Sequence, residues 1–315
     1  MWELFGPALF AGWILDLLFG DPAWLYHPVV AIGKLISFLE KRLRARGGNL
    51  RRSALVLTGA TVFTAMGACA LVLYLLSLFG RVPLFIGMAL LDWLGLAARS
   101  MVQEARGVAS ALDEGLDAGR KQVSRIVGRD TQSLTSEEVI KATVETVSEN
   151  TTDGVISPML YAFIGGPVLL WGFKAASTLD SMVGYLDEKY RDIGWSSARL
   201  DDILNYLPAR LTALLMVLSA YLLRLDGKRA LDTVRRDHAN HLSPNCAWSE
   251  AAAAGALGIQ LGGTHLYFGK PVVKPTIGDA LRPAEKSDIT KTCLLLYFSS
   301  GILMLILLLL TLVLQ

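Results

Sequence analysis

Long apolar runs alternate along the chain with shorter polar blocks. The apolar runs that could cross a membrane are residues 4–19, 54–79, 84–98, 155–171, 211–225 and 293–314. A helix needs about 20 apolar residues to cross a hydrocarbon core about 30 Å thick. Residues 54–79 and 293–314 reach that length without interruption. The pattern therefore predicts an all-α, polytopic helical membrane protein that forms a single integral-membrane catalytic domain over residues 1–315.

One of these runs is unusual for a simple span. Residues 155–171 contain Pro158 and the sequence Gly165-Gly166-Pro167, and irregular backbone at membrane depth is tolerated only where it is buried or lines a cavity. We therefore expect a broken or re-entrant helix there. If this run and 211–225 both cross fully, residues 174–208 lie outside; if neither crosses, all polar blocks share the cytoplasmic side. We favour shallow or re-entrant behaviour for at least the first run.

The polar blocks predict further helices. Thr135 and Glu138 have the spacing of a capping box, which favours a helix start at this point. A helix over 174–190 would place Asp180 and Asp187 seven residues apart, roughly on one face. The other expected elements are an interfacial amphipathic helix over 29–39, a helix over 196–205 capped by Ser196 or Ser197, and a loop over 269–283.

Composition agrees with a membrane protein. Hydrophobic residues make up 53% of the chain and charged residues 18%, below the roughly 25% that is typical of soluble domains. The net charge of +2 is close to neutral, and no basic face with interleaved aromatic residues indicates nucleic acid as a partner. The basic residues of 41–52 favour a cytoplasmic location and contact with anionic lipid, so the bilayer itself is an expected partner.

An acidic group precedes the run at 155–171. Glu145 and Glu149 are four residues apart on the predicted helix and are therefore neighbours on its surface. Asn150 and Asp153 follow, so this face approaches the membrane. A solvated acidic face is one interpretation. A metal or phosphate site is the other, because carboxylates suit Mg²⁺, which is often bound together with substrate phosphates.

Asp16 is an ionisable residue inside the first apolar run, where such a group normally faces a partner or a water-filled cavity. We expect it to pair with an arginine or with His27. Two further polar clusters follow the acidic group. They comprise Ser177, Thr178, Asp180 and Ser181, and then Arg199, Asp201, Asp202, Asn205 and Arg210.

In combination, these motifs resemble those of a known family over nearly the whole chain, the adenosylcobinamide-phosphate synthases of cobalamin biosynthesis. The motifs are Asp16 to Pro22 with His27-Pro28, Arg129-Asp130-Thr131, Glu145 to Asn150 with Asp153, Thr178 to Met182, Ala198 to Asp202 with Asn205 and Arg210, and Ser243-Pro244-Asn245. Two residues depart from the expected pattern: Ser177 stands in place of an asparagine, and Leu242 in place of a proline.

The resemblance implies an amide ligation between adenosylcobyric acid, a corrinoid, and aminopropanol phosphate, aminopropanol or ethanolamine phosphate. It implies ATP as co-substrate, Mg²⁺, and no tightly bound organic cofactor. The expected catalytic residues are Glu145, Glu149, Asp153, Asp180 and Asp201. The expected metal ligands are Glu149, Asp153, Asp180 and Asp202. The expected substrate- or phosphate-binding residues are His27, Arg129, Asp130, Thr131, Asn150, Thr178, Ser181, Arg199, Asn205, Arg210, Ser243 and Asn245.

The same acidic residues could also serve a function of a different class. A membrane transporter could employ them as a cation path, and a scaffold could handle a corrinoid without chemistry. The absence of visible repeat symmetry argues against the transporter. For the enzyme we expect the bacterial cytoplasmic (inner) membrane, several spans and an active site that faces the cytoplasm. The oligomeric state is left open.

Overall fold

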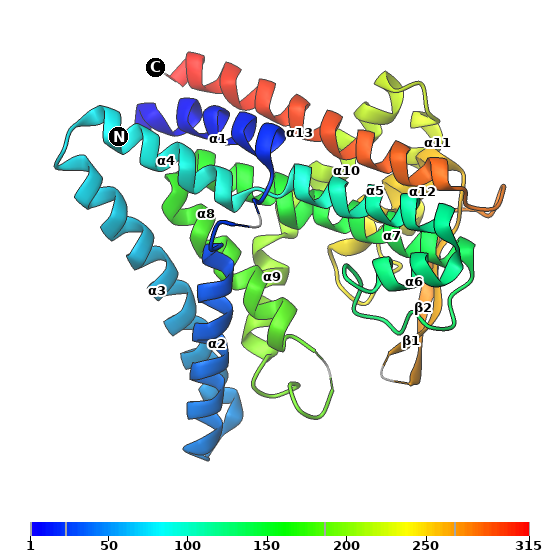
Figure 1. Ribbon diagram of the computed structural model, residues 1–315, viewed down its shortest axis with the longest axis horizontal. Helices are drawn as coiled ribbons and strands as arrows, with labels where there is room; N and C mark the ends of the chain where they lie inside the picture. The colour runs from blue at the N-terminus through cyan, green and yellow to red at the C-terminus, as the bar shows by residue number, and fades with distance from the viewer. Residues whose placement is uncertain (1, 23, 186, 268, 315) are drawn as a thin grey trace. The chain divides into compact units, whose positions relative to one another are not determined.

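The computed structural model describes residues 2–22, 24–185, 187–267 and 269–314 (Figure 1). The chain folds into two compact units. Unit 1 comprises Met1–Ala97, Ser157–Asn205 and Met304–Gln315, and unit 2 comprises Ala98–Ile156 and Tyr206–Leu303. Each unit takes segments from both halves of the sequence. The division therefore does not separate an N-terminal from a C-terminal domain, and the single catalytic domain stays a prediction.

Helices form unit 1. They are η1 (Trp2–Leu4), α1 (Phe5–Phe19), α2 (Pro28–Ala45), α3 (Leu50–Ser77), α4 (Arg81–Gly95), α8 (Ser157–Val183) and α9 (Trp195–Leu204). Helices α1 and α4 approach closely at Gly12, where an added Cβ would lie 2.8 Å from the Ala89 carbonyl oxygen and from the Trp93 nitrogen. A larger side chain would force the two helices apart, so glycine permits this packing.

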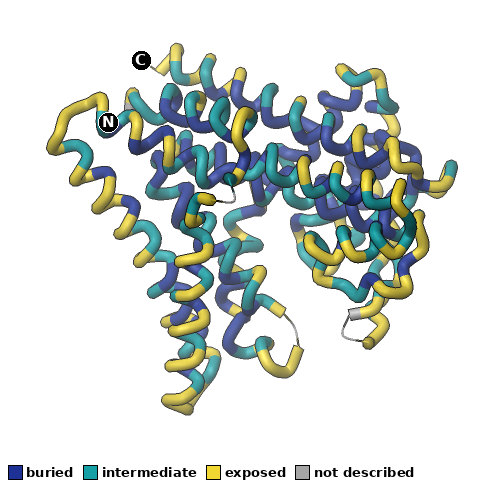
Figure 2. The backbone as a smooth tube through the Cα atoms, in the orientation of Figure 1, coloured by how far each residue is buried: buried dark blue, intermediate teal, exposed yellow. Residues whose placement is uncertain are grey.

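Many positions along helix α3 are exposed (Figure 2), and several of them are apolar. Phe63 is 74% exposed, and Leu55 and Leu71 are each 57% exposed. A soluble helix would turn such residues inward, whereas a helix in lipid turns them outward. Most of the predicted span 54–79 thus lies in one continuous helix, which ends at Ser77 and has a surface suited to the bilayer.

Helix α8 contains the break expected between residues 155 and 171. Its backbone leaves helical geometry at Gly165 and Gly166, and Gly166 has a φ of 64°. An L side chain rarely adopts that φ, and Pro167 then has no N–H to offer a preceding carbonyl. A short π-helical segment, η2 (Thr152–Ile156), precedes α8. The sequence correctly located this break.

Four helical stretches are long and apolar enough to cross a membrane: Leu50–Ser77, Arg81–Glu114, Ser136–Val183 and Lys286–Leu314. A fifth is obtained if the bent pair Trp195–Leu204 and Tyr206–Leu222 counts as one span. Helix α1 is apolar but shorter, with 15 residues. These helices confirm a polytopic helical membrane protein. Which of them cross fully stays a prediction.

Unit 2 adds a hairpin to its helices. Its elements are α5 (Ala98–Glu114), α6 (Leu116–Val123), α7 (Ser136–Thr151), η2, α10 (Tyr206–Leu222), α11 (Gly227–Asp237), α12 (Cys246–Leu257), β1 (Leu261–Tyr267), β2 (Lys270–Ile277) and the start of α13 (Lys286–Leu314). Helix α12 is rich in alanine and largely buried. Alanine and glycine let α12 approach its neighbours: a Cβ on Gly255 would lie 2.7 Å from the Ala230 Cα on α11.

The loop expected over 269–283 was wrong for its first part, because β1 and β2 pair as an antiparallel hairpin. Glycine and proline obscured the strand pattern in the sequence. The register shifts between Gly262 and Gly263, whose φ angles are 74° and 98°. Such a shift twists the ladder and directs the Gly262 N–H away from it.

Two local expectations were also wrong. Helix α8 ends at Val183 rather than Tyr190, and the Asp187 carboxylate instead accepts a hydrogen bond from the Tyr190 N–H in a turn. Helix α9 begins after Gly194 without a side-chain cap. The hydroxyl of Ser196 lies 2.7 Å from the Thr58 hydroxyl on α3, so Ser196 joins helices and does not cap one.

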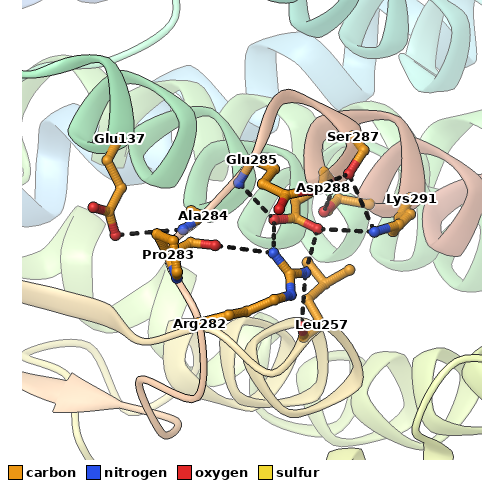
Figure 3. A network of polar contacts seen from close by, with 10 residues as sticks. Glu137, Leu257, Arg282, Pro283, Ala284, Glu285, Ser287, Asp288 and Lys291 are labelled. Atoms are coloured by element: carbon orange, nitrogen blue, oxygen red, sulfur yellow. Dashed lines mark hydrogen bonds and ion pairs between the residues drawn. The ribbon is translucent and has the colours of Figure 1, made fainter.

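An ion-pair network fixes the start of α13 in unit 2 (Figure 3). The fully buried Asp288 carboxylate accepts hydrogen bonds from the Arg282 guanidinium at 2.6 and 2.8 Å and from the Glu285 N–H at 2.9 Å. Arg282 also donates to the Leu257 carbonyl at the end of α12. One carboxylate therefore caps α13 and holds it against α12.

Candidate functional site

Helix α7 carries the acidic group of unit 2. The Thr135 hydroxyl accepts a hydrogen bond from the Glu138 N–H, and the Glu138 carboxylate accepts one from the Thr135 N–H at 2.7 Å. The predicted capping box is thus confirmed. It fixes where the helix starts, and therefore which residues face α12 and the hairpin.

Glu145 is the central acid of this face. Its carboxylate forms an ion pair with the Arg129 guanidinium, and each side chain is only 7% exposed. The other oxygen of Glu145 accepts a hydrogen bond from the Gly262 N–H at 2.8 Å. A buried charge is tolerated only when it is paired and hydrogen-bonded, and Glu145 satisfies both conditions. It thereby ties the Arg129 segment and the hairpin to α7.

His265 on β1 contacts the arginine of the Arg129–Glu145 ion pair. The Arg129 Nη1 lies 3.0 Å from the His265 Nε2. Because a guanidinium can only donate, Nε2 must accept, and the neutral ring must carry its proton on Nδ1. Burial and the Arg129 charge lower the pKa of His265, which also favours the neutral ring.

Glu149 lies one turn beyond Glu145 on α7. The Cys246 thiol at the start of α12 donates to the Glu149 carboxylate, with 3.1 Å between sulfur and oxygen. Burial raises the pKa of Cys246, and the nearby carboxylates, Glu149 before Asp153, add to this effect. The thiol therefore stays protonated and serves as a donor rather than a nucleophile.

Glu250 is an acid that the sequence reasoning missed. It lies on α12, is only 4% exposed, and has the carboxylates of Glu145 and Glu149 as neighbours. Burial and these two charges raise its pKa well above the usual range, which favours a protonated carboxyl. A single glutamate within an alanine run gives no periodic signal, so only the packing of α12 on α7 reveals it.

The turn before α12 positions a histidine and a lysine. The Ser243 N–H donates to the His241 Nδ1 at 3.0 Å, and the Ser243 hydroxyl accepts from the Asn245 N–H at 3.2 Å. The His241 Nε2 lies 3.2 Å from the Lys274 Nζ on β2. Ser243 and Asn245 were predicted to bind substrate. Here Ser243 shapes the turn, and Asn245 is buried at the start of α12.

The Arg129-Asp130-Thr131 motif supports the hairpin. The Asp130 N–H donates to the Leu266 carbonyl at 2.8 Å, and the Asp130 carboxylate accepts from the Gly269 N–H at 2.7 Å. Thr131 is buried behind it. The motif thus joins β1 through backbone contacts. A role for Asp130 and Thr131 in binding phosphate stays a prediction.

Two further predicted residues of unit 2 contact its helices. The Asn150 amide donates to the Thr146 carbonyl one turn earlier on α7. The Arg210 guanidinium stacks over the rings of Tyr206 at 3.5 Å and Trp248 at 4.7 Å. A stacked guanidinium keeps its charge and donors available for an anion.

Unit 1 holds the remaining predicted residues. His27 begins α2, its Nδ1 accepts from the Val29 N–H at 3.2 Å, and its Nε2 lies 3.7 Å from the Asp21 carboxylate. Burial lowers the pKa of His27, and the Lys174 charge adds to this effect, while Asp21 opposes it. Asp16 is fully buried on α1. Its expected pairing stays a prediction.

A chain of polar contacts joins α8 and α9 in unit 1. The Ser157 hydroxyl donates to the side-chain Oδ1 of the buried Asn205 at 2.7 Å, and the Asn205 side-chain Nδ2 donates to the Asp201 carboxylate at 3.0 Å. Arg199 and Asp202 lie 3.9 Å apart one turn away from each other. The hydroxyls of Thr178 and Ser181 donate to carbonyls of α8 itself.

The predicted site residues therefore fall into two groups. Unit 2 contains Arg129, Asp130, Thr131, Glu145, Glu149, Asn150, Asp153, Arg210, Ser243 and Asn245, and unit 1 contains His27, Thr178, Asp180, Ser181, Arg199, Asp201, Asp202 and Asn205. Unit 2 also contains four residues that the sequence reasoning did not select, His241, Glu250, His265 and Lys274.

Divalent metal was expected at Glu149, Asp153, Asp180 and Asp202. Across residues 2–22, 24–185, 187–267 and 269–314, no group of three or more His, Cys, Asp or Glu side chains is arranged to hold a metal ion. Mg²⁺ commonly uses one or two protein carboxylates, with phosphate and water completing its shell. Glu149 and Asp153 both act on the Cys246 thiol. Two carboxylates match the number that a Mg²⁺ ion arriving with a phosphate commonly uses, and this metal site stays a prediction.

Known proteins resemble the chain along most of its length. A family model described as CobD/Cbib protein matches residues 9–296. The "Cobalamin biosynthesis protein CobD" of Geobacter metallireducens is 50% identical over 302 residues, which cover 96% of this chain and 95% of the relative. The protein of the same name from Listeria monocytogenes is 47% identical, covering 93% and 94%. The "Cobalamin biosynthesis protein CbiB" of Salmonella arizonae is 47% identical, covering 91% and 92%. No solved structure matches the chain.

Proposed function

The chain belongs to the CobD/CbiB family, and from that premise we propose that it is a membrane ligase of cobalamin biosynthesis. It joins a carboxylate of adenosylcobyric acid to the amine of aminopropanol phosphate, with aminopropanol and ethanolamine phosphate as the other candidate amines. One observation carries the proposal. Unit 2 gathers three buried or half-buried acids on two packed helices and surrounds them with an arginine, a lysine and two histidines.

Amide formation from a carboxylate requires activation. A carboxylate is a poor acyl donor, so ATP transfers a phosphoryl group to it, and the free amine then attacks the acyl phosphate. Phosphoryl transfer depends on cations that neutralise the phosphate charge and on precise positioning of the reacting groups. Arg210 is suited to bind a phosphate, because its guanidinium is stacked on two rings and can donate bidentately.

Glu149 and Asp153 are the carboxylates of unit 2 that would hold Mg²⁺. The metal would neutralise phosphate charge when bound. Cys246 donates to Glu149 and thereby orients its carboxylate. Asp180 and Asp202 belong to unit 1 and remain candidates for a second metal or for substrate binding.

Ligation by purified protein in detergent tests the proposal. We expect ATP cleavage and amide product in equal amounts, and only when both the corrinoid acid and the amine are present. Glu149→Gln removes the charge that holds the metal and should lower the rate by at least about 10- to 100-fold, which is the loss that follows removal of a mere outer-shell partner. The exposed Glu188→Gln is the matched control and should keep the wild-type rate. ATP-independent flux of substrate in sealed vesicles would instead identify a transporter, and full activity of Glu149→Gln would exclude this metal site.

We also propose the bacterial cytoplasmic membrane, with the polar segments on the cytoplasmic side. The exposed basic residues of 41–52 support this orientation. The segment after α8 provides a test, because Glu188 there is exposed. In a cysteine-free background, Glu188→Cys should react with an impermeant thiol reagent only in inside-out vesicles. Labelling only from outside intact cells would contradict the orientation.

A further inference from the structure

Lys274 and His241 form a pair of bases beside the three acids of unit 2. Their nitrogens, Nζ and Nε2, are 3.2 Å apart. His241 belongs to the turn between α11 and α12, and Lys274 belongs to β2. Both side chains are half-buried. The packing of the hairpin on the helices creates this pair, because 33 residues separate the two partners in sequence.

The backbone determines which nitrogen of His241 carries the proton. The Ser243 N–H can only donate, and it lies 3.0 Å from the His241 Nδ1, so Nδ1 must accept. Burial lowers the pKa of His241, as does the charge of Lys274 whenever that lysine is protonated, while Glu149 and Glu145 oppose the shift. The neutral ring is thus favoured, and it is also the form that lets Nδ1 accept from Ser243. A neutral imidazole has one proton, and that proton must then be on Nε2. Nε2 therefore donates, and its neighbour Lys274 Nζ must offer a lone pair.

A lysine can offer a lone pair only as a neutral amine. An ammonium at this position would direct an N–H against the Nε2–H of His241. The hydrogen bond from His241 thus stabilises the amine form of Lys274. In a buried polar site, lysine readily changes its protonation state, which is the basis of its use as a base in enzymes.

The charges around this pair suit the uptake of one proton. Glu145 and Glu149 on α7 act on His241, and Glu250 on α12 interacts with Lys274. On the opposing side, Arg129 and His265 surround Glu145. Arg129 compensates the charge of Glu145.

We propose that the Lys274 amine, oriented by His241, is the base that removes a proton from the ammonium of the amine substrate. This inference rests on the proposed amide ligation and assigns its proton acceptor. The substrate R–NH₃⁺ passes one proton to Lys274, which gives R–NH₂ and a lysine ammonium. In accepting it, Lys274 exchanges the hydrogen bond from His241 for the bond to the substrate proton.

The remaining steps balance without another reactant. The lone pair of R–NH₂ forms the C–N bond at the acyl phosphate carbon. The C–O bond to phosphate breaks, and the second proton of the nitrogen leaves with the phosphate as HPO₄²⁻. Lys274 returns its proton to water before the next turnover. Two protons thus leave the nitrogen, and one remains on the amide.

A cationic role for Lys274 is the competing explanation, and Lys274→Arg separates the two. Arginine keeps the charge but cannot accept a proton. If Lys274 is the base, ligation of the amino-alcohol phosphate should fall about 10²- to 10⁴-fold in this variant. The rate should recover partly as rising pH deprotonates the substrate without help. Lys270→Arg is the matched control, since Lys270 is exposed on the same strand.

Hydroxylamine provides the decisive readout, because it is largely unprotonated at neutral pH and needs no base. It captures an acyl phosphate as a hydroxamate. Lys274→Arg should form the ATP-dependent hydroxamate within a few-fold of the wild-type rate, which also demonstrates that the variant is folded. Small primary amines should rescue amide formation by Lys274→Ala. Loss of both products together, or retention of amide formation, would overturn the assignment. Failure of the wild-type protein to form either product would overturn the proposed function itself.

Discussion

Replacing Arg129 by alanine should destabilise unit 2 by about 3–5 kcal/mol and abolish ligation. The substitution leaves the Glu145 carboxylate buried, with the Gly262 N–H as its remaining hydrogen-bond donor described here. It also removes the donor that fixes the His265 ring. Chemical denaturation in detergent measures the first effect, and the ligation assay measures the second.

Arg125→Ala is the matched control for this prediction. Arg125 also pairs with a glutamate, Glu104, but its side chain is 61% exposed. Exposed pairs contribute about 0–1 kcal/mol, so this variant should unfold almost as the wild type does. Equal destabilisation by the two substitutions would show that the buried Arg129–Glu145 pair contributes no more to stability than the exposed Arg125–Glu104 pair.

A double substitution separates stability from activity. In Arg129→Met with Glu145→Leu, both charges are replaced by apolar groups, and such replacements of buried pairs are often neutral or stabilising. We expect the double variant to recover most of the lost stability while ligation stays abolished. Recovery of ligation would show that the ion pair serves only the fold.

The sequence predicted the elements that depend on local interactions. The capping box at Thr135 involves residues three positions apart, and the break at Gly165-Gly166 requires a backbone conformation that only glycine adopts easily. Both were correctly located. The predicted cap of α9 was wrong, because the Ser196 hydroxyl has a partner on α3 that lies 138 residues earlier in the chain. The predicted helix end at Tyr190 was also wrong, because α8 ends at Val183.

The residues that gather around Glu145 in unit 2 could not be predicted in the same way. Glu145 was selected because Glu149 follows it by one helical turn. Its partner, the Gly262 N–H, lies 117 residues away and becomes available only where the hairpin register shifts. Glu250 stands alone in an alanine run, and Lys274 lies in a stretch that was expected to be a loop. Their roles arise from helix packing and from a hairpin that glycine and proline obscured in the sequence.

The start of α13 gives the second large effect: Asp288→Ala should lower the stability of unit 2 by about 2–4 kcal/mol, because it removes a helix cap and charge-assisted hydrogen bonds. Asp288 is fully buried and accepts hydrogen bonds from Arg282, Lys291 and the Glu285 N–H (Figure 3). Alanine leaves two cations without their carboxylate and removes the cap of a 29-residue helix. Chemical denaturation in detergent should show the loss.

Asp113→Ala is the control, because Asp113 pairs with Lys286 in the same region but is 66% exposed. It should cost no more than about 1 kcal/mol. Asp288→Asn distinguishes charge from shape, since the amide oxygen can still accept from the Glu285 N–H but cannot neutralise Arg282. If the ion pair dominates, Asp288→Asn should lose nearly as much stability as Asp288→Ala. If capping dominates, Asp288→Asn should retain most of the wild-type stability. The stability lost by Asp288→Ala would then come from the missing helix cap and not from the broken contact with α12.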